Sequence, residues 1–459
     1  MHLPFLDREE ERSRLERLFA RREGSLGVLY GRRRSGKSRL LREALPSKGV
    51  VNYVGDERES TLQRASLARE IDRVIPGFAR VSYPDWDALL ARFWNEAGPG
   101  AVLVLDEFPA LVSAARELPS LLQKHVDRES SRGIHIVLSG SSQRMMQGLV
   151  LDRTAPLFGR AVEILKVAPL LAGWIQPALH LRDPIEAVRA FAVWGGIPRY
   201  WELAADLPDL ETAVVRLALS PLGVLYDEPT TLLLDDTRDT AQAASLLSLI
   251  GQGCHRLSEI AGRLGKPATS LSRPLQRLIE LDLIRREVPF GVSPRSAKRT
   301  RYQIADPFLR FWFRFVEPNR SRLEAGLLTA VSRDMKRDFS HHVSGLWEEL
   351  ARASVPRLDI IGQRFGPASR WWGAGLDLKP LEIDIVAESE DRKSLLLGEV
   401  EWAEQTDAVR LAAELRRKAE NLPFREGRNA RLALWTKRAA RVPRDLRVLT
   451  PRQVLDVLR

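Results

Sequence analysis

Gly31-Arg32-Arg33-Arg34-Ser35-Gly36-Lys37-Ser38 is the stretch that decides the fold of this 459-residue chain. An apolar run, Val28–Tyr30, precedes it, and a helix-forming segment, Arg39–Leu45, follows it. Glycines at a strand-to-helix turn let successive backbone N–H groups curl around phosphate oxygens, and the N-terminus of a helix favours an anion there. The pattern therefore predicts a phosphate-binding loop, with Lys37 at the β- and γ-phosphates and Ser38 as a Mg2+ ligand. The residues expected to hold the nucleotide are Gly31, Ser35, Gly36, Lys37, Ser38 and Arg39.

The composition is that of an ordinary globular protein with a basic balance. Hydrophobic residues make up 44% of the chain and charged residues 29%, and the net charge of +11 favours polyanionic partners. One cysteine, Cys254, excludes internal disulfides and cysteine-based metal sites and suits a reducing cytosol. The most apolar region, Val167–Leu181, is interrupted by prolines and glycine and does not predict a membrane span. We therefore expect a cytoplasmic protein of about three domains.

Short apolar strand candidates alternate with helical segments over the first 165 residues, at Gly27–Tyr30, Val50–Val54, Ala101–Leu105, Ile134–Ser139 and Ala161–Leu165. This alternation is typical of a parallel sheet covered on both faces. The third strand ends in Asp106 and Glu107. Asp106 is placed to hold Mg2+ through water or Ser38, and Glu107 to accept a proton from an attacking water. A strand followed by an acidic turn is the alternative.

Two further positions near strand ends are candidates for sensing the γ-phosphate. The fourth strand runs into Gly140-Ser141-Ser142, and we expect the Ser141 hydroxyl beside the γ-phosphate if this strand lies between the first and the third. A turn rich in Ser and Gly is the alternative. Arg160, just before the fifth strand, is expected to act as an arginine finger or phosphate sensor, and a surface salt bridge is the alternative. The expected catalytic residues are thus Lys37, Asp106, Glu107, Ser141 and Arg160.

Together these segments resemble the archaeal-type P-loop ATPase family, which is related to the AAA+ and STAND groups. The resemblance rests on Phe5–Glu9, the phosphate loop, Leu105–Phe108, Gly140–Ser142 and Pro156–Arg160. It implies ATP and Mg2+ as ligands, an α/β fold with sheet order 5-1-4-3-2, a helical lid at residues 166–240, and an adenine seat near Phe5–Glu9. The family usually has Gly where this chain has Asp7, so the adenine contact departs from the pattern.

Residues 241–318 have the layout of a winged helix-turn-helix, with three short helical segments followed by two strands and a basic loop between them. Residues 251–305 hold eleven Lys and Arg against four Asp and Glu. Thr269 and Ser270 are placed to face a major groove, whereas Pro274 predicts that the third helix starts late or is kinked. We expect DNA contact here, with a protein-contact module as the alternative. The basic residues expected at DNA are Arg273, Arg277, Arg295, Lys298, Arg299 and Arg301.

Residues 319–459 form the last expected domain, in which two strand candidates, Leu381–Val386 and Leu395–Trp402, follow a helix. Alternate side chains of a strand share a face, so Glu399 and Glu401 point together and Asp384 can face them. A cluster of carboxylate oxygens of this kind suits Mg2+.

This segment resembles the PD-(D/E)xK fold of restriction endonucleases, a domain that commonly follows archaeal-type ATPases. The resemblance implies that Asp384 and Glu399 are metal ligands and that Glu348 completes the site. Where that fold usually has Lys, this chain has Glu401, which places excess negative charge where a DNA phosphate must approach. Lys418 on the next helix is a candidate replacement that no sequence feature positions. Both an active nuclease and a degenerate scaffold domain stay open.

The expected order is a P-loop ATPase core (1–165), a helical lid (166–240), a winged helix (241–318) and a nuclease-like domain (319–459). We expect a protein that binds and hydrolyses ATP and whose cycle controls the two DNA-facing domains, with a homo-oligomer or a protein partner as further possibilities. The alternatives are an ATP-gated, Mg2+-dependent DNA nuclease, for example in defence against foreign DNA, and a non-catalytic nucleotide switch that regulates transcription. A P-loop kinase ranks lower, because no acceptor-binding lid motif is evident.

Overall fold

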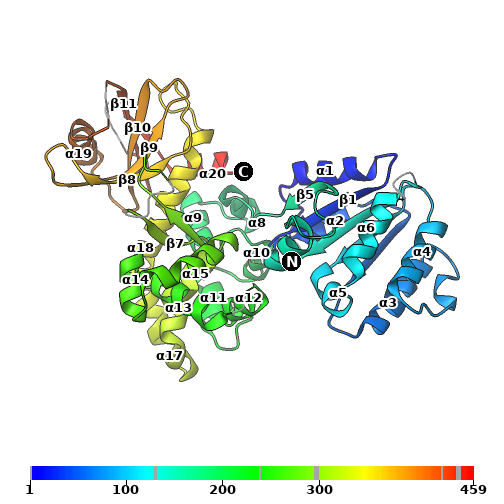
Figure 1. Cartoon of the computed structure of the whole chain (residues 1–459). Coiled ribbons are helices and arrows are strands. Elements are labelled where there is room, and N and C mark those ends of the chain that lie inside the picture. The colour runs from blue at the N-terminus through cyan, green and yellow to red at the C-terminus, as the bar shows by residue number, and fades with distance from the viewer. Residues whose placement is uncertain (1–2, 129–131, 237–238, 294–298, 425–426, 441–445) are drawn as a thin grey trace. The chain divides into compact units, whose positions relative to one another are not determined.

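The computed structural model describes residues 3–459 except 129–131, 237–238, 294–298, 425–426 and 441–445 (Figure 1). This part of the chain forms two compact units. The smaller unit comprises residues 7–169 and 197–199, and the larger unit comprises residues 1–6, 170–196 and 200–459. The boundaries expected at residues 165, 240 and 318 stay predictions.

The smaller unit is built on a five-stranded parallel sheet. Its strands are β1 (Ser25–Tyr30), β2 (Val50–Val54), β3 (Val102–Asp106), β4 (His135–Gly140) and β5 (Ala161–Lys166). Their order is β2-β3-β4-β1-β5, which is the expected order 5-1-4-3-2 viewed from the other edge. The sheet order is therefore confirmed. Because β4 pairs with both β1 and β3, the carboxyl ends of these three strands meet at one edge.

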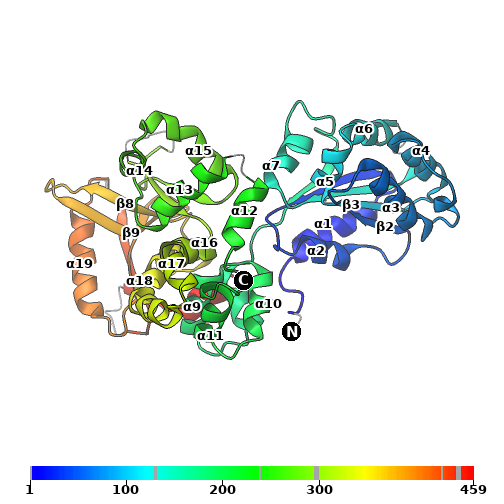
Figure 2. The same ribbon diagram turned by 90° about the horizontal axis from the view of Figure 1, so that it is seen from below.

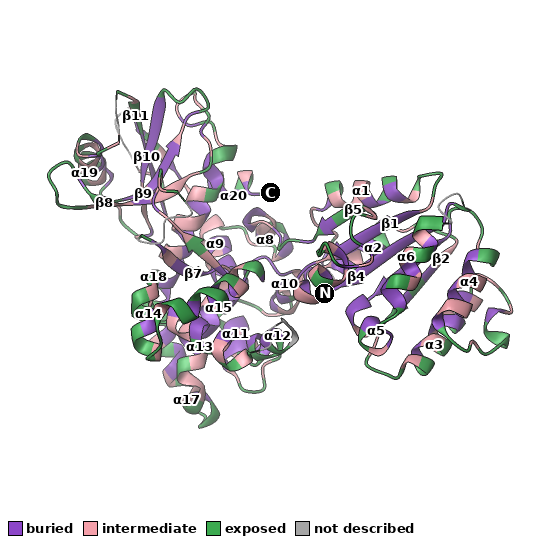
Figure 3. Ribbon diagram, viewed as in Figure 1, coloured by how far each residue is buried: buried purple, intermediate pink, exposed green. Residues whose placement is uncertain are grey.

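Helices cover both faces of this sheet, which explains why β1, β3 and β4 are buried almost completely (Figure 3). Leu26 and Val28 of β1 belong to a large core formed with the helices on one face of the sheet. On the opposite face α1 packs so closely that a Cβ at Gly27 would lie 2.8 Å from the Leu18 side chain. The helices are α1 (Glu9–Phe19), α2 (Lys37–Ala44), α3 (Ser60–Asp72), α4 (Trp86–Glu96), α5 (Phe108–Ala114), α6 (Leu118–Arg128) and α7 (Gln143–Met146).

The larger unit begins with a helical segment. It comprises η4 (Ala172–Trp174), α8 (Ile175–Ala178), α9 (Pro184–Trp194), α10 (Pro198–Ala205), α11 (Leu210–Val214), η5 (Val215–Leu219) and α12 (Glu228–Asp236). Three helices and an antiparallel strand pair follow, which are α13 (Thr240–Gly251), α14 (Leu257–Leu264), α15 (Ala268–Glu280), β6 (Ile284–Glu287) and β7 (Arg301–Ile304). Of the two expectations for the third helix, the late start is wrong, since α15 begins at Ala268 and continues through Pro274, and a kink stays a prediction. Buried Leu271, Leu275 and Leu278 hold it against the other helices.

Aromatic helical turns connect this part to a long helix. They are α16 (Pro307–Phe311), η6 (Trp312–Val316), η7 (Glu317–Asn319), α17 (Arg320–Glu324), α18 (Leu328–Ser354) and η8 (Val355–Arg357). A mixed five-stranded sheet of order β12-β11-β10-β9-β8 follows, with α19 (Ala408–Glu420) packed on it (Figure 2). Its strands are β8 (Ser369–Ala374), β9 (Pro380–Glu388), β10 (Ser394–Glu401), β11 (Asn429–Thr436) and β12 (Leu446–Leu449).

The last helix of the chain, α20 (Pro451–Val457), packs on η4 and α9 at the start of the larger unit. The Gly173 N–H donates to the Leu458 carbonyl at 2.8 Å, and a Cβ at Gly173 would lie 2.1 Å from the Leu455 carbonyl oxygen. Only glycine permits this backbone approach. The two ends of the larger unit therefore close on each other.

Candidate nucleotide site and carboxylate pair

The phosphate loop joins β1 to α2, as the sequence predicts. Glycine is required at each of its two glycine positions for a different structural reason. A Cβ at Gly31 would lie 2.5 Å from the Val167 carbonyl oxygen, so a side chain does not fit there. Gly36 is the N-cap of α2 with φ 95°, a left-handed conformation that glycine adopts without strain. No side chain caps α2, so its first N–H groups remain directed into the loop.

Lys37 and Ser35 lie buried inside this loop. The Lys37 Nζ donates to the carbonyl oxygens of Gly31 and Arg32 at 2.8 and 3.1 Å, which holds the ammonium group within the loop. The Ser35 Oγ is buried without a hydrogen-bond partner among the described residues. A buried hydroxyl without a partner is costly, and a phosphate oxygen is a suitable acceptor for it. Arg39, the sixth expected ligand, lies on α2 within 4.0 Å of Glu43.

A chain of hydrogen bonds joins α2 to the ends of β3 and β4. The Ser38 hydroxyl donates to Asp106 Oδ2 at 3.0 Å, and the Glu107 N–H donates to Asp106 Oδ1 at 3.0 Å. The Ser141 hydroxyl and N–H both donate to Glu107 Oε2, at 2.9 and 3.2 Å. Glu107 has φ 49°, a strained conformation for a residue with a side chain. Four predicted site residues from three segments are thus brought together.

Arg160 lies in a different arrangement. Its guanidinium forms two hydrogen bonds to the Asp127 carboxylate, at 2.7 and 2.9 Å, and also donates to the Pro156 carbonyl. This ion pair lowers the pKa of Asp127 through a direct hydrogen bond. The geometry matches the surface salt bridge that the sequence left as the alternative to a phosphate sensor.

The segment before α1 contains a residue that the sequence did not single out. Asp7 and Arg8 both have left-handed conformations, with φ 58° and 75°, which explains why glycine suits the Asp7 position. The Arg8 side chain is buried, donates to the Ala168 carbonyl and pairs with Glu11 at 2.9 Å. Arg8 therefore connects the start of α1 to the segment that follows β5. The only sequence signal for this role was that Arg8 and Glu11 carry opposite charges.

In the larger unit, Asp384 and Glu399 lie on the neighbouring strands β9 and β10, and Lys418 of α19 lies beside Glu399. The Lys418 Nζ donates to Glu399 Oε1 at 2.8 Å, while the Val400 N–H donates to Asp384 Oδ2 at 3.1 Å. Burial, and then the charge of Asp384, raise the pKa of Glu399 to about 7. Burial also raises the pKa of Asp384. A cation that no sequence feature positioned thus stands beside the expected carboxylates.

Glu348 does not join this pair as the sequence predicted. It forms ion pairs with Arg370 of β8 and, at 3.7 Å, with Arg352 on its own helix. Among the described residues, no three acidic, histidine or cysteine side chains are grouped to hold a metal ion. Arginines thus engage the third expected carboxylate, and the three-carboxylate metal site stays a prediction. Glu401 ends β10 half-buried, with one carboxylate oxygen lacking a partner among the residues described.

The basic residues expected at DNA divide into three groups. Arg273 is exposed on α15, and Arg277 lies 3.8 Å from Glu280. Arg301 instead pairs with Glu382 of β9 at 3.1 Å and lies over the Trp372 ring at 4.7 Å, so it is turned toward the C-terminal sheet. The exposed Arg299 lies close to Gly373 of the same sheet. Arg295 and Lys298 fall outside the described residues.

Comparison with protein families agrees with the geometry of the smaller unit. Residues 5–200 match the family described as an ATPase domain predominantly from Archaea. The smaller unit is an archaeal-type ATPase domain. Residues 312–412, outside this ATPase domain, match a family of archaeal and bacterial proteins of unknown function. A protein of Methanocaldococcus jannaschii, MJECL04, described as uncharacterized, is 28% identical over 91% of this chain and 92% of its own length.

Two solved structures are similar to this chain. The Walker-type ATPase PABY2304 of Pyrococcus abyssi is similar, with a TM-score of 0.51 and 22% identity, over 68% of this chain and 96% of that one. The ORC2 protein of Aeropyrum pernix matches with a TM-score of 0.47 and 14% identity, over 73% of this chain and 97% of its own. In the described part of the chain, no helix is long and apolar enough to cross a membrane.

Proposed function

We propose that the ATPase domain hydrolyses ATP by in-line attack of a water molecule, with Glu107 as the general base. The hydrogen-bonded chain Ser38–Asp106–Glu107–Ser141 is the observation that carries this proposal. Two donors from Ser141 orient the Glu107 carboxylate, the group that would accept a proton from the attacking water. Lys37, held inside the loop, exchanges its two carbonyl acceptors for phosphate oxygens when ATP binds.

Ser38 and Asp106 fit a magnesium ion, because both present oxygen atoms that lie 3.0 Å apart. When bound there, Mg2+ would neutralise charge on the β- and γ-phosphates. Asp106 also accepts a hydrogen bond from the Glu107 N–H. The same carboxylate would therefore hold the metal ion and position the backbone of the proposed base. The orphaned Ser35 hydroxyl supplies one further donor to phosphate.

The test separates binding from hydrolysis. We expect Lys37→Ala to abolish tight ATP binding, measured with a fluorescent ATP analogue, because it removes the cation inside the loop. Glu107→Gln should keep ATP binding and lower the turnover rate by about a hundredfold or more. Lys124→Ala, which breaks an exposed ion pair with Asp87, is the matched control for both assays. Full turnover by either active-site variant would show that the proposal is wrong.

We propose further that the ATPase cycle controls DNA binding by the larger unit. Support comes from α13–α15 with β6 and β7, a layout that agrees with a winged helix, and from the exposed Arg273 on α15. Arg301 is not assigned to DNA here, since Glu382 and Trp372 engage it. DNA affinity should fall with salt and weaken in Arg273→Ala. Affinity that ignores both changes would favour a protein-contact module.

A second candidate function is Mg2+-dependent DNA cleavage, and one observation favours it. Lys418 of α19 donates to Glu399 and so places a positive charge beside the carboxylates. The nuclease fold usually takes this charge from a lysine at the strand position that Glu401 occupies here. A cavity of about 670 Å3 opens at Lys418 between α19 and residues 377–382. Plasmid incubated with Mg2+ or Mn2+ should be cut by the parent and not by Asp384→Ala or Lys418→Ala. Absent cutting by the parent would leave the C-terminal sheet as a scaffold.

A further inference from the structure

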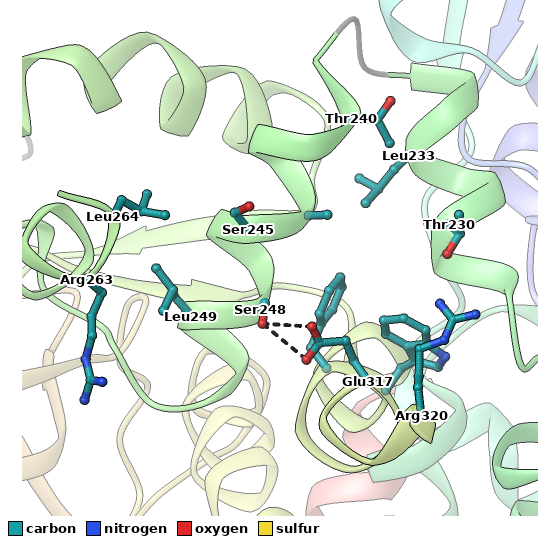
Figure 4. A pocket seen from close by; sticks show the side chains of 13 residues that line it. Thr230, Leu233, Thr240, Ser245, Ser248, Leu249, Arg263, Leu264, Glu317 and Arg320 are labelled. Carbon is teal, nitrogen blue, oxygen red and sulfur yellow. Dashed lines mark hydrogen bonds between the residues drawn. The ribbon is translucent and has the colours of Figure 1, made fainter. Parts of the chain in front are cut away.

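A cavity of about 450 Å3 lies in the larger unit, away from the carboxylate pair (Figure 4). Helices α12 and α13 form two of its walls, and α14 and residues 312–320 complete it. Its volume is within the range of pockets that hold small organic ligands. No residue of the proposed ATP site or the proposed DNA surface contributes to it.

The lining of this cavity is amphipathic. Apolar side chains from four elements form a continuous surface, and Trp312 and Phe313 are themselves buried. The apolar residues are Leu233, Ala244, Leu249, Leu264, Trp312 and Phe313, and the hydroxyl residues are Thr230, Thr240, Ser245 and Ser248. An apolar lining of this kind suits the flat or aliphatic body of a ligand.

The charged groups of the lining differ in how they are compensated. Glu317 accepts hydrogen bonds from Ser248 at 3.1 and 3.2 Å, as Figure 4 shows. Arg320 forms an ion pair with Asp227 at 2.5 Å. Arg263 is exposed, and the described residues offer it no hydrogen bond or ion pair. Among the charged lining residues, Arg320 is therefore paired with a carboxylate, Glu317 is held by a neutral hydroxyl, and Arg263 has no ion pair within the described part of the chain.

We propose that this cavity binds a small amphipathic anion, with an apolar or aromatic body against Trp312 and Leu249 and a carboxylate, sulfonate or phosphate group at Arg263. A ligand bound in this way contacts α12 and α13 at once. It would fasten the helical segment that follows the ATPase domain to the three helices that precede the β6–β7 pair.

The probe for the test is 8-anilinonaphthalene-1-sulfonate, which has the proposed chemistry, titrated into the full chain by fluorescence and equilibrium dialysis with excess ATP analogue present. Ser245→Trp places a large side chain in the cavity and should remove one probe site. Ala241→Trp is the matched control, because this exposed position lies one turn earlier on α13 and does not line the cavity. Unchanged binding to Ser245→Trp, or equal loss in both variants, overturns the proposal.

Arg263→Ala tests the anion requirement at an exposed position where folding is not at risk. We expect this variant to bind the sulfonate probe about fivefold more weakly. Arg256→Ala, an arginine just before α14 that does not line the cavity, should bind it normally. N-phenyl-1-naphthylamine, which lacks the sulfonate, should bind the parent more weakly than the sulfonate probe does. Equal binding of the two probes, or no effect of Arg263→Ala, overturns the assignment of an anion.

Discussion

Glu349 is the acidic residue whose removal should most affect the larger unit. It lies on α18, only 12% exposed, between Arg285 of β6 and Arg310 of α16. Arg285 donates to it at 2.7 Å, and Arg310 lies 2.6 Å away. Glu349→Gln keeps the shape of the side chain and removes its charge. It leaves two arginines without their shared carboxylate, which is the costly way to break a buried ion pair.

The size of the effect follows from the pKa of Glu349. Burial opposes its ionisation, but Arg285 and Arg310 outweigh burial and lower the pKa from 4.5 to about 2. A lowered pKa means that ionisation stabilises the folded state above pH 4.5 and that this contribution is lost as the pH falls toward 2. At pH 7 the contribution is about 3 kcal/mol. Glu349→Gln should therefore cost about that much at pH 7 and about half as much at pH 3.

Hydrogen exchange measured by mass spectrometry tests this prediction within the intact chain. A loss of about 3 kcal/mol should speed exchange of α18 and β6 amides by about a hundredfold at pH 7. Peptides from β1 and β3 of the ATPase domain serve as an internal reference. Glu259→Gln, which alters an exposed pair 3.8 Å from Arg256, should change little. Equal exchange of parent and Glu349→Gln at pH 7, or an effect that persists undiminished at pH 3, would refute the reasoning.

Three further outcomes are expected. Gly31→Ala should weaken ATP binding about tenfold or more, since its Cβ would meet the Val167 carbonyl at 2.5 Å, whereas Gly98→Ala, with open space, should not. Ser141→Ala should slow hydrolysis about tenfold while ATP binding holds, as a stopped-flow assay would show. Burial raises the pKa of Glu399 to about 7, so its ionisation destabilises the fold as pH rises from 4.5; Glu399→Gln should slow β10 exchange relative to the parent at pH 8 but not at pH 4.

The nucleotide site was predictable because its residues follow directly from local pattern. A glycine-rich turn after one buried strand and an Asp-Glu pair after another specify a strand-to-helix loop and a neighbouring strand end. Parallel pairing then brings Ser38, Asp106 and Ser141 together at the same edge.

The contacts that the sequence did not predict share a physical cause, which is pairing across long stretches of chain. Arg160 finds Asp127 33 residues away, and Arg301 finds Glu382 81 residues away. Lys418 reaches Glu399 only because α19 packs on β10 and β11. No periodicity in sequence encodes such contacts, since tertiary packing decides which charge a long side chain meets.

The contact between α20 and the segment around Gly173 bears on the order in which the chain folds during synthesis. Arg459 and Gly173, which meet in the folded unit, are 286 positions apart. All residues of the smaller unit have been synthesised once the chain reaches residue 199, so this unit can fold while the rest of the chain is still being made. The η4 and α9 segments of the larger unit precede residue 199 in sequence and must wait for α20 to cover them. Until then its apolar η4 and α9 surfaces are exposed, which makes this the stage of biogenesis most prone to aggregation.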